Sequence, residues 1–235
     1  MPVHAIAYND SMSPQSILYI VATPIGDPGD ITIRALETLR AVDIIICEER
    51  RQGSAMLKQL GISPKELIEI NEHNEAEQVS ELVNRMLITP ISAALISDCG
   101  TPVFSDPGSL LINQAAGMGI TVSPIPGASS FMAALSILDF KATQFVFGGF
   151  LSRVPDQRRR DLTRLRGLRM PVVLMDTPYR LAALLDDVIK VFGKGAHVTL
   201  ACDLTLPREK IYRGSAIEVL QQVSQKKAEF ILIIH

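Results

Sequence analysis

The groups best suited to binding a ligand lie in three loops rich in glycine and proline. The central loop spans residues 97–108, the first loop spans residues 23–30, and the third loop spans residues 126–130. Each loop follows an apolar run and precedes a helical pattern, which indicates a strand, a tight turn and a helix. Open α/β sheets bind ligands at the carboxyl ends of their parallel strands. We therefore predict that the three loops meet at one edge of a parallel sheet and form a single binding site.

The three loops offer backbone N–H and C=O groups, small hydroxyls and few charges. The sequence contains neither GxGxxG nor GxxxxGK[ST], the usual motifs of dinucleotide and nucleoside triphosphate sites. No Ser/His/Asp set and no Cys/His pair can be singled out. This chemistry favours a neutral or zwitterionic cofactor over a polyphosphate. The scattered histidines and the three widely spaced cysteines match no metal-ligand or disulfide pattern, so we predict no metal site and a reducing, cytoplasmic location.

Alternating strands and helices position these loops. Five apolar runs, each followed by a helical pattern, predict a mostly parallel, doubly wound α/β sheet. These runs are residues 17–22, 43–47, 67–70, 91–96 and 121–125. At the end of the central loop, Asp106 and Pro107 are predicted to be the N-cap and the first residue of the next helix.

A second, smaller α/β domain is expected after residues 139–141, where the aromatic-rich run 143–150 introduces β-character without a short crossover. We predict domains at residues 17–139 and 140–235. Further strands are expected at residues 172–175 and 198–202, near Ile211, and at residues 230–234. Residues 1–16 lack the features of a signal peptide, and no apolar run approaches the roughly 20 residues that span a membrane.

One basic patch stands out in a chain whose formal net charge is −2. Because the chain as a whole does not attract nucleic acid, an RNA partner needs such a local patch. With no aromatic residue interleaved, these arginines are predicted to contact phosphates and not bases. A solvated helix with surplus charge is the alternative. The patch consists of Arg153, Arg158, Arg159, Arg160, Arg164, Arg166 and Arg169.

Several runs of the sequence resemble the tetrapyrrole methylase superfamily of S-adenosylmethionine-dependent methyltransferases. Residues 18–26 and 29–32 resemble its opening motif. Residues 97–102, 105–108 and 124–128 resemble one branch, which methylates a cytidine ribose 2′-oxygen in small-subunit ribosomal RNA. The likeness spans about residues 17–235, and it continues through residues 149–151, 177–180, 204–205 and 212–214.

The resemblance implies a two-domain enzyme that binds S-adenosylmethionine between its domains, usually as a homodimer. It implies methyl transfer to ribosomal RNA, with Arg153, Arg158, Arg159, Arg160 and Arg164 as candidate RNA contacts. Methylation of a tetrapyrrole or another small metabolite, and a non-catalytic cofactor-binding protein, are the alternatives. The cofactor contacts that it implies by position are Pro24, Ile25, Gly100, Thr101, Pro102, Val103, Phe104, Ser129, Ser130, Met175, Ala201 and Cys202.

Carboxylates are the candidate catalytic groups, because methylation of a ribose hydroxyl is helped by a base that accepts its proton. Asp98, which opens the central loop, is the first candidate, and Glu48 and Glu49 are the others.

The chain also departs from the pattern of this branch, which usually carries a further small extension after the position of His235. Four replacements stand out: Asp27-Pro28 for Asn-Leu, Glu48-Glu49-Arg50-Arg51 for Glu-Asp-Thr-Arg, Gly148 for Glu, and Cys202-Asp203 for Arg-Glu.

Overall fold

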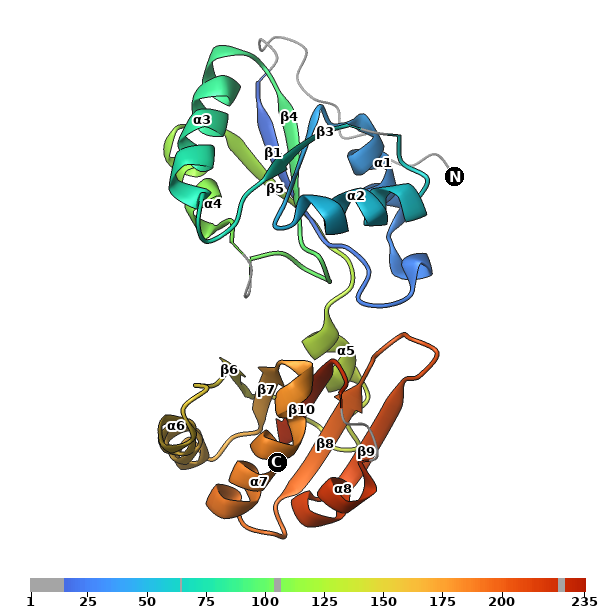
Figure 1. The fold of residues 1–235 in the computed structure, drawn as a ribbon, viewed down its shortest axis with the longest axis vertical. Helices are drawn as coiled ribbons and strands as arrows, with labels where there is room; N and C mark the ends of the chain where they lie inside the picture. The colour runs from blue at the N-terminus through green and yellow to red at the C-terminus, as the bar shows by residue number, and fades with distance from the viewer. Residues whose placement is uncertain (1–14, 64, 104–106, 224–226) are drawn as a thin grey trace. The chain divides into compact units, whose positions relative to one another are not determined.

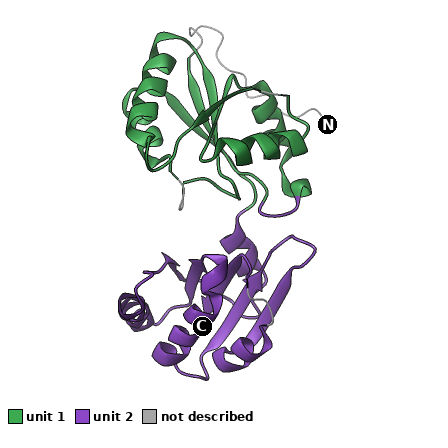
Figure 2. Cartoon of the chain, in the orientation of Figure 1, with its two compact units in different colours: residues 1–24, 28–128 green, residues 25–27, 129–235 purple. Residues whose placement is uncertain are grey.

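The computed structural model describes residues 15–63, 65–103, 107–223 and 227–235. They form two compact units, which are coloured separately in Figure 2. The first unit contains the chain up to Pro24 and the segment Pro28–Ala128. The second contains the short segment Ile25–Asp27 together with Ser129–His235.

The first unit is built on a five-stranded sheet in the order β3-β2-β4-β1-β5, with every neighbouring pair parallel (Figure 1). Its strands are β1 (Ile17–Val21), β2 (Ile44–Cys47), β3 (Glu66–Glu69), β4 (Ser92–Ile96) and β5 (Thr121–Ile125). They are connected by the 3-10 turn η1 (Pro28–Asp30) and by the helices α1 (Ile33–Ala41), α2 (Arg50–Gln59), α3 (Glu75–Ile88) and α4 (Ser109–Gly117). The predicted parallel, doubly wound sheet is confirmed.

Alternation along the strands builds a separate core on each face of this sheet. On one face, Ile46 belongs to the same cluster as Leu82 of α3 and Leu111 of α4. On the other face, Ile45 clusters with Leu39 of α1. Figure 1 shows α1 and α2 on the opposite side of the sheet from α3 and α4. Helices therefore cover both faces, and the carboxyl-edge loops are the surface left for a ligand.

The helix after the central loop begins later than the sequence predicted. Helix α4 starts at Ser109 with Gly108 at its N-cap, so the expectation that Pro107 is the first helical residue is wrong. Gly108 has φ of 126°, and a Cβ there would approach the side chain of Leu95 to 2.6 Å. Its N–H donates to Glu75 Oε1 at 2.9 Å. Only glycine fits this conformation and this close approach. The predicted cap Asp106 lies outside the described residues.

The second unit has a mixed sheet in the order β6-β7-β10-β8-β9. Strand β6 is parallel to β7, whereas β10 is antiparallel to both of its neighbours and β8 is antiparallel to β9. Its strands are β6 (Val146–Phe150), β7 (Val172–Asp176), β8 (His197–Cys202), β9 (Lys210–Ser215) and β10 (Phe230–Ile234). Its helical segments are α5 (Ser130–Ser136), α6 (Pro155–Gly167), the 3-10 turn η2 (Pro178–Arg180), α7 (Leu181–Phe192) and α8 (Ala216–Gln222).

Helix α5 belongs to the second unit. Its fully buried Ala134 lies in a cluster with Val173, Ala201 and Ile231 of the mixed sheet. The two units consequently divide between Ala128 and Ser129, earlier in the chain than residues 139–141.

Candidate active site

Hydrogen bonds join the three loops at the carboxyl edge of the first sheet. Strand β1 lies between β4 and β5, so the loops that follow these strands are neighbours. The Thr23 N–H donates to the carbonyl oxygen of Gly100 at 2.9 Å, and the Thr23 hydroxyl donates to that of Ser97 at 3.0 Å. The Thr101 hydroxyl donates to the carbonyl oxygen of Ala128 at 3.0 Å. The loops meet at one edge, as the sequence predicted.

The central loop has an unusual backbone. Gly100 has φ of 83°, and Val103, a β-branched residue, has φ of 79°. A non-glycine residue in this region is strained, and the surrounding structure must hold it there. Val103 is half-buried and packs against the core cluster that contains Leu111. Phe104, the next predicted cofactor contact, lies outside the described residues.

The first loop is fixed at both ends. Thr23 anchors its start through the bonds just described. At the other end, the Asp27 N–H donates to the Thr205 hydroxyl oxygen at 2.9 Å. A Cβ on Gly26 would come within 2.6 Å of that oxygen and 2.7 Å of the Leu204 carbonyl oxygen. The predicted contacts Pro24 and Ile25 therefore lie between two anchored points.

Sequence reasoning did not assign Thr205 to the site. The available signal was the Leu204-Thr205 match noted in the resemblance. In the structure, Thr205 has φ of 64° and Asp203 has φ of 51°, so two residues of this turn occupy the left-handed region. The Thr205 N–H donates to Glu209 Oε2 at 2.7 Å, which holds the turn closed.

Two of the predicted cofactor contacts in the second unit share one face of the mixed sheet. Met175 of β7 and Ala201 of β8 both pair with Ile231 of the intervening strand β10. All three contact the cluster that α5 covers. The predicted contacts Ser129 and Ser130 are the N-cap and the first residue of α5.

Cys202 differs from its neighbour Ala201, because its side chain points to the opposite face. The side chain packs in the cluster that includes Leu200 and Leu232. Burial raises the pKa of its thiol to about 12. Only the backbone of Cys202 can therefore serve as a contact on the face that holds Met175.

The candidate catalytic carboxylates follow two adjacent strands, β2 and β4. Asp98 is exposed directly after β4, and its charge is one of the causes, after burial, that raise the pKa of Cys47 at the end of β2 to about 11. Glu48 and Glu49 line a pocket of about 530 Å³ together with residues of the β3–α3 connection and of the α4 start. The other lining residues are Glu69, Asn71, Glu72, His73, Glu75, Pro107 and Ser109.

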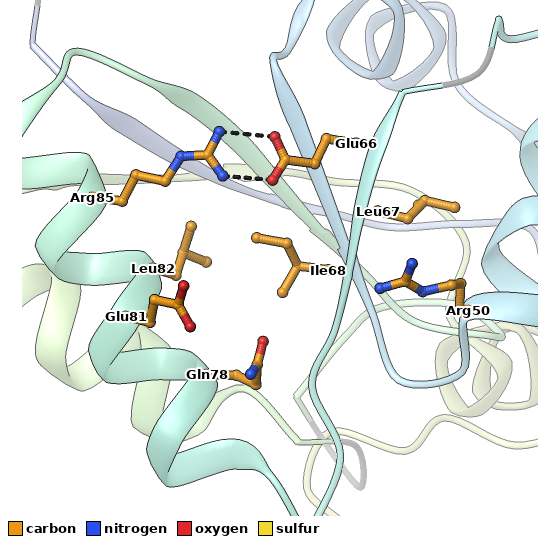
Figure 3. A pocket seen from close by; sticks show the side chains of 8 residues that line it. All are labelled: Arg50, Glu66, Leu67, Ile68, Gln78, Glu81, Leu82 and Arg85. Atoms are coloured by element: carbon orange, nitrogen blue, oxygen red, sulfur yellow. Dashed lines mark hydrogen bonds and ion pairs between the residues drawn. The ribbon is translucent and has the colours of Figure 1, made fainter.

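A second pocket, of about 320 Å³, lies along the edge strand β3 (Figure 3). Arg85 and Glu66 form a two-pronged ion pair across it, with N–O distances of 2.5 and 2.8 Å. Hydrogen bonds from Arg85 lower the pKa of Glu66. The residues that line this pocket include Arg50, at the start of α2, but none from the three loops. It is therefore separate from the predicted cofactor site.

The structure divides the basic patch into buried and exposed arginines. Arg158 is buried and pairs with buried Asp187 at 2.6 Å, so its prediction as a surface RNA contact is wrong. Helical spacing places it on the same face as Leu162 and Leu165, which are both buried. Arg159 is half-buried and also pairs with Asp187, at 3.2 Å.

The rest of the patch is exposed: Arg153, Arg160, Arg164, Arg166 and Arg169. Arg160 donates to Gln157 Oε1 within the same helix. The surface left for phosphate contacts is thus smaller than the sequence indicated.

The described part of the chain was searched for membrane-spanning helices and for metal-binding groups of side chains. No helix among these residues is both long and apolar enough to span a membrane. The same residues include no group of three or more His, Cys, Asp or Glu side chains arranged to hold a metal ion.

Crystal structures of methyltransferases and of a synthase have the same fold as this chain. Diphthine synthase superposes with a TM-score of 0.73 at 18% identity, covering 93% of this chain and 89% of that chain. A uroporphyrin-III C-methyltransferase from Thermus thermophilus, complexed with S-adenosyl homocysteine, gives 0.64 at 16% identity, covering 93% and 96%. At this identity the likeness shows the fold alone. The two-unit α/β architecture with loops joined at a parallel sheet edge is therefore a fold that this chain shares with these proteins.

Sequence comparison gives the family. The model of tetrapyrrole (corrin/porphyrin) methylases matches residues 17–220, and the chain belongs to this family. The predicted fold, family and enzyme class are confirmed: the protein is a methyltransferase whose methyl donor is S-adenosylmethionine.

Curated relatives extend the match over most of the chain. The ribosomal RNA small subunit methyltransferase I of Xylella fastidiosa is 37% identical over 227 residues, which are 95% of this chain and 82% of that protein. The protein of the same name from Leptospira biflexa is 35% identical over 222 residues, covering 94% and 91%.

Proposed function

We propose that this protein methylates small-subunit ribosomal RNA at the ribose 2′-oxygen of a cytidine. The observation that carries this proposal is 35–37% identity, over more than nine-tenths of the chain, to enzymes named as ribosomal RNA small subunit methyltransferases. The solved structures of enzymes named for uroporphyrin III or cobalt precorrin-4 share only 16–19% identity with it. The tetrapyrrole alternative therefore has less support.

We propose that the three loops bind the methyl donor, S-adenosylmethionine, because their chemistry suits a sulfonium cofactor. Gly100 and Val103, with their positive φ angles, give the central loop a backbone path that regular helices and strands do not adopt. A sulfonium cofactor needs carbonyl oxygens and apolar walls, not a phosphate cradle. We assign these contacts to Pro24, Ile25, Gly100, Thr101, Pro102, Val103, Phe104, Ser129, Ser130, Met175 and Ala201, with the backbone of Cys202.

When bound, S-adenosylmethionine supplies an electrophilic methyl group. The protein would hold the ribose hydroxyl close to that methyl group, since near-attack positioning is the main aid to such a displacement. The proton that the hydroxyl loses on methylation would pass to a carboxylate of this chain. We assign this role to Asp98, because it is exposed beside the central loop, and we keep Glu48 and Glu49 of the acidic pocket as the alternatives.

Calorimetric titration with S-adenosylmethionine and S-adenosylhomocysteine tests the cofactor site. Binding to the folded state must raise the melting temperature, by an amount that grows with ligand concentration. Absence of both heat and thermal stabilisation at about 100 times a micromolar Kd would overturn the assignment.

Methyl transfer into ribosomal RNA tests the substrate. Small subunits from a strain that lacks the gene should gain one ribose methyl group at a cytidine when incubated with the protein and labelled cofactor. Label that enters a small-molecule fraction instead would support the tetrapyrrole or metabolite alternative. No transfer despite cofactor binding would support a non-catalytic binding protein. The cytoplasmic location and the homodimer remain predictions, and gel filtration with light scattering checks the dimer.

A further inference from the structure

An exposed aromatic side chain lies just after the carboxyl end of strand β7 in the second sheet. Tyr179 lies in the 3-10 turn η2 after β7, and 74% of its surface is accessible. The Lys227 ammonium nitrogen lies 4.6 Å from the centroid of the Tyr179 ring. A cation on one face of an aromatic ring leaves the remaining surface open to another flat group.

The turn that carries Tyr179 is rigidly attached to the loop after β6. Arg180 donates to the carbonyl oxygens of Leu151 and Ser152 at 3.1 and 2.7 Å. Arg180 also pairs with buried Asp176 at 3.0 Å, which ties it to the end of β7. Tyr179 is therefore presented by an ordered backbone, although its own side chain is in solvent.

The loop after β6, which Arg180 holds, carries further exposed apolar side chains and a further positive charge. Phe150, at the end of β6, is 47% exposed, and Val154 is 59% exposed. Arg153 lies between them in sequence and is exposed. It directly follows Ser152, whose carbonyl oxygen accepts from Arg180 at 2.7 Å. The backbone of Arg153 therefore lies next to the η2 turn.

We propose that Tyr179, Lys227 and Arg153 form a stacking site for an unpaired RNA base. The inference rests on the proposed function and deepens it, because it names how the RNA is held. Single-stranded RNA is recognised by stacking of splayed bases on aromatic side chains, with cations at the flanking phosphates. The sequence predicted phosphate contacts alone, because no aromatic residue is interleaved with the arginines. The fold supplies the aromatic from another loop.

Stacking and charge predict different responses to mutation. Replacing Tyr179 by Ala should weaken binding of a single-stranded oligoribonucleotide from small-subunit ribosomal RNA on the order of 5- to 100-fold, with an unchanged salt slope. Tyr179→Phe keeps the ring and should bind within about twofold of the unmodified protein. Lys227→Gln should instead reduce the salt slope by about 0.7.

The control is Ile88→Ala, which removes an apolar side chain that is 84% exposed in the first unit. It should leave RNA affinity unchanged. Because Tyr179 and Ile88 are both exposed, all variants should fold, and S-adenosylhomocysteine affinity measured by calorimetry verifies this.

The outcomes separate this inference from the proposed function. If Tyr179→Ala binds and methylates RNA like the unmodified protein, the stacking site is overturned while the proposed function stands. If Tyr179→Phe loses as much affinity as Tyr179→Ala, the hydroxyl and not the ring face makes the contact, which also overturns it. If the unmodified protein binds S-adenosylhomocysteine but no RNA, the proposed substrate and the stacking site fail together.

Discussion

At the scale of residues, burial separates the three cysteines into two kinds of thiol. Cys47 and Cys202 are buried, and burial raises the pKa of their thiols to about 11 and about 12. Cys99 is exposed in the central loop. The thiolate is the reactive form, so exposure favours reaction at Cys99, and the raised pKa values of Cys47 and Cys202 disfavour reaction at those two thiols.

We expect a disulfide reagent at about pH 8 to modify Cys99 rapidly in the folded protein, and all three cysteines only in denaturant. Saturating S-adenosylhomocysteine should slow the fast reaction, because the central loop is proposed to hold the cofactor. The Cys99→Ser variant should lack the fast phase. A labelling rate that does not respond to S-adenosylhomocysteine contradicts the assignment of this loop.

Replacement of Asp98 by Asn tests the proposed proton acceptor. The amide keeps the shape but cannot take the proton, so kcat should fall by about 100- to 10,000-fold while the Kd for S-adenosylhomocysteine stays unchanged. Glu48→Gln and Glu49→Gln, measured in parallel, compare the alternatives. Full turnover by the Asp98→Asn variant removes Asp98 from the catalytic residues.

At the scale of elements, the turn at residues 203–206 fixes the first loop. Gly26→Ala would drive a Cβ into the Thr205 hydroxyl and the Leu204 carbonyl. Because backbone atoms cannot move aside, Pro24 and Ile25 should shift, and the Kd for S-adenosylhomocysteine should rise by roughly tenfold. Gly117→Ala is the matched control, since no atom lies within 4 Å of the added Cβ.

The hydroxyl of Thr205 can be tested separately. Thr205→Ser keeps the acceptor for the Asp27 N–H and should retain cofactor affinity, whereas Thr205→Val loses it and should weaken binding. Equal effects of both variants would indicate a steric role for Thr205 and not a positioning role through Asp27.

The buried pair between α6 and α7 is the second prediction at this scale. Arg158→Met would leave Asp187 buried with only its longer contacts to Arg159 and Lys190, at 3.2 and 3.4 Å. We expect a loss of about 3 kcal/mol in the free energy of unfolding, measured in urea. Arg160→Gln, an exposed neighbour, should change it by less than about 0.5 kcal/mol.

The same pair predicts a pH dependence. Burial acts to raise the pKa of Asp187, but hydrogen bonds from Arg158 and Arg159 outweigh it and leave that pKa lowered. The pair therefore stabilises the fold above the ordinary aspartate pKa, and this stability is lost as the pH falls through the lowered value. In Arg158→Met the acid unfolding limb should move to higher pH. An unchanged limb contradicts this account.

At the scale of the whole molecule, a net charge of −2 means that RNA affinity depends on a local surface. Among the exposed arginines of the patch, Arg153, Arg160 and Arg164 are the ones that we expect to contact phosphates. Changing all three to Gln should weaken RNA binding uniformly across sequences and reduce the salt slope by about 2. Cofactor affinity should not change. An unchanged salt slope of RNA binding would indicate that these arginines are solvent-exposed and do not contact RNA.

The sequence by itself determined the elements and the family. Continuous apolar runs and the helical spacing of apolar residues are local properties, so the strands near residues 17–22, 91–96 and 121–125 were predicted within a residue of their observed bounds. The meeting of the three loops followed from parallel strands alone. The start of α4 was missed, because the close approach of Gly108 to Leu95 is a packing contact.

Only the tertiary structure decided which groups share a surface. In the sequence, nothing distinguishes Arg158 from the exposed arginines beside it. Its burial depends on Asp187, which lies 29 positions away on another helix. The insertion of β10 between β7 and β8 orders the second sheet. The cation beside Tyr179 comes from Lys227, far along the chain. Such pairings depend on how elements pack against one another, and no local period in the sequence encodes that packing.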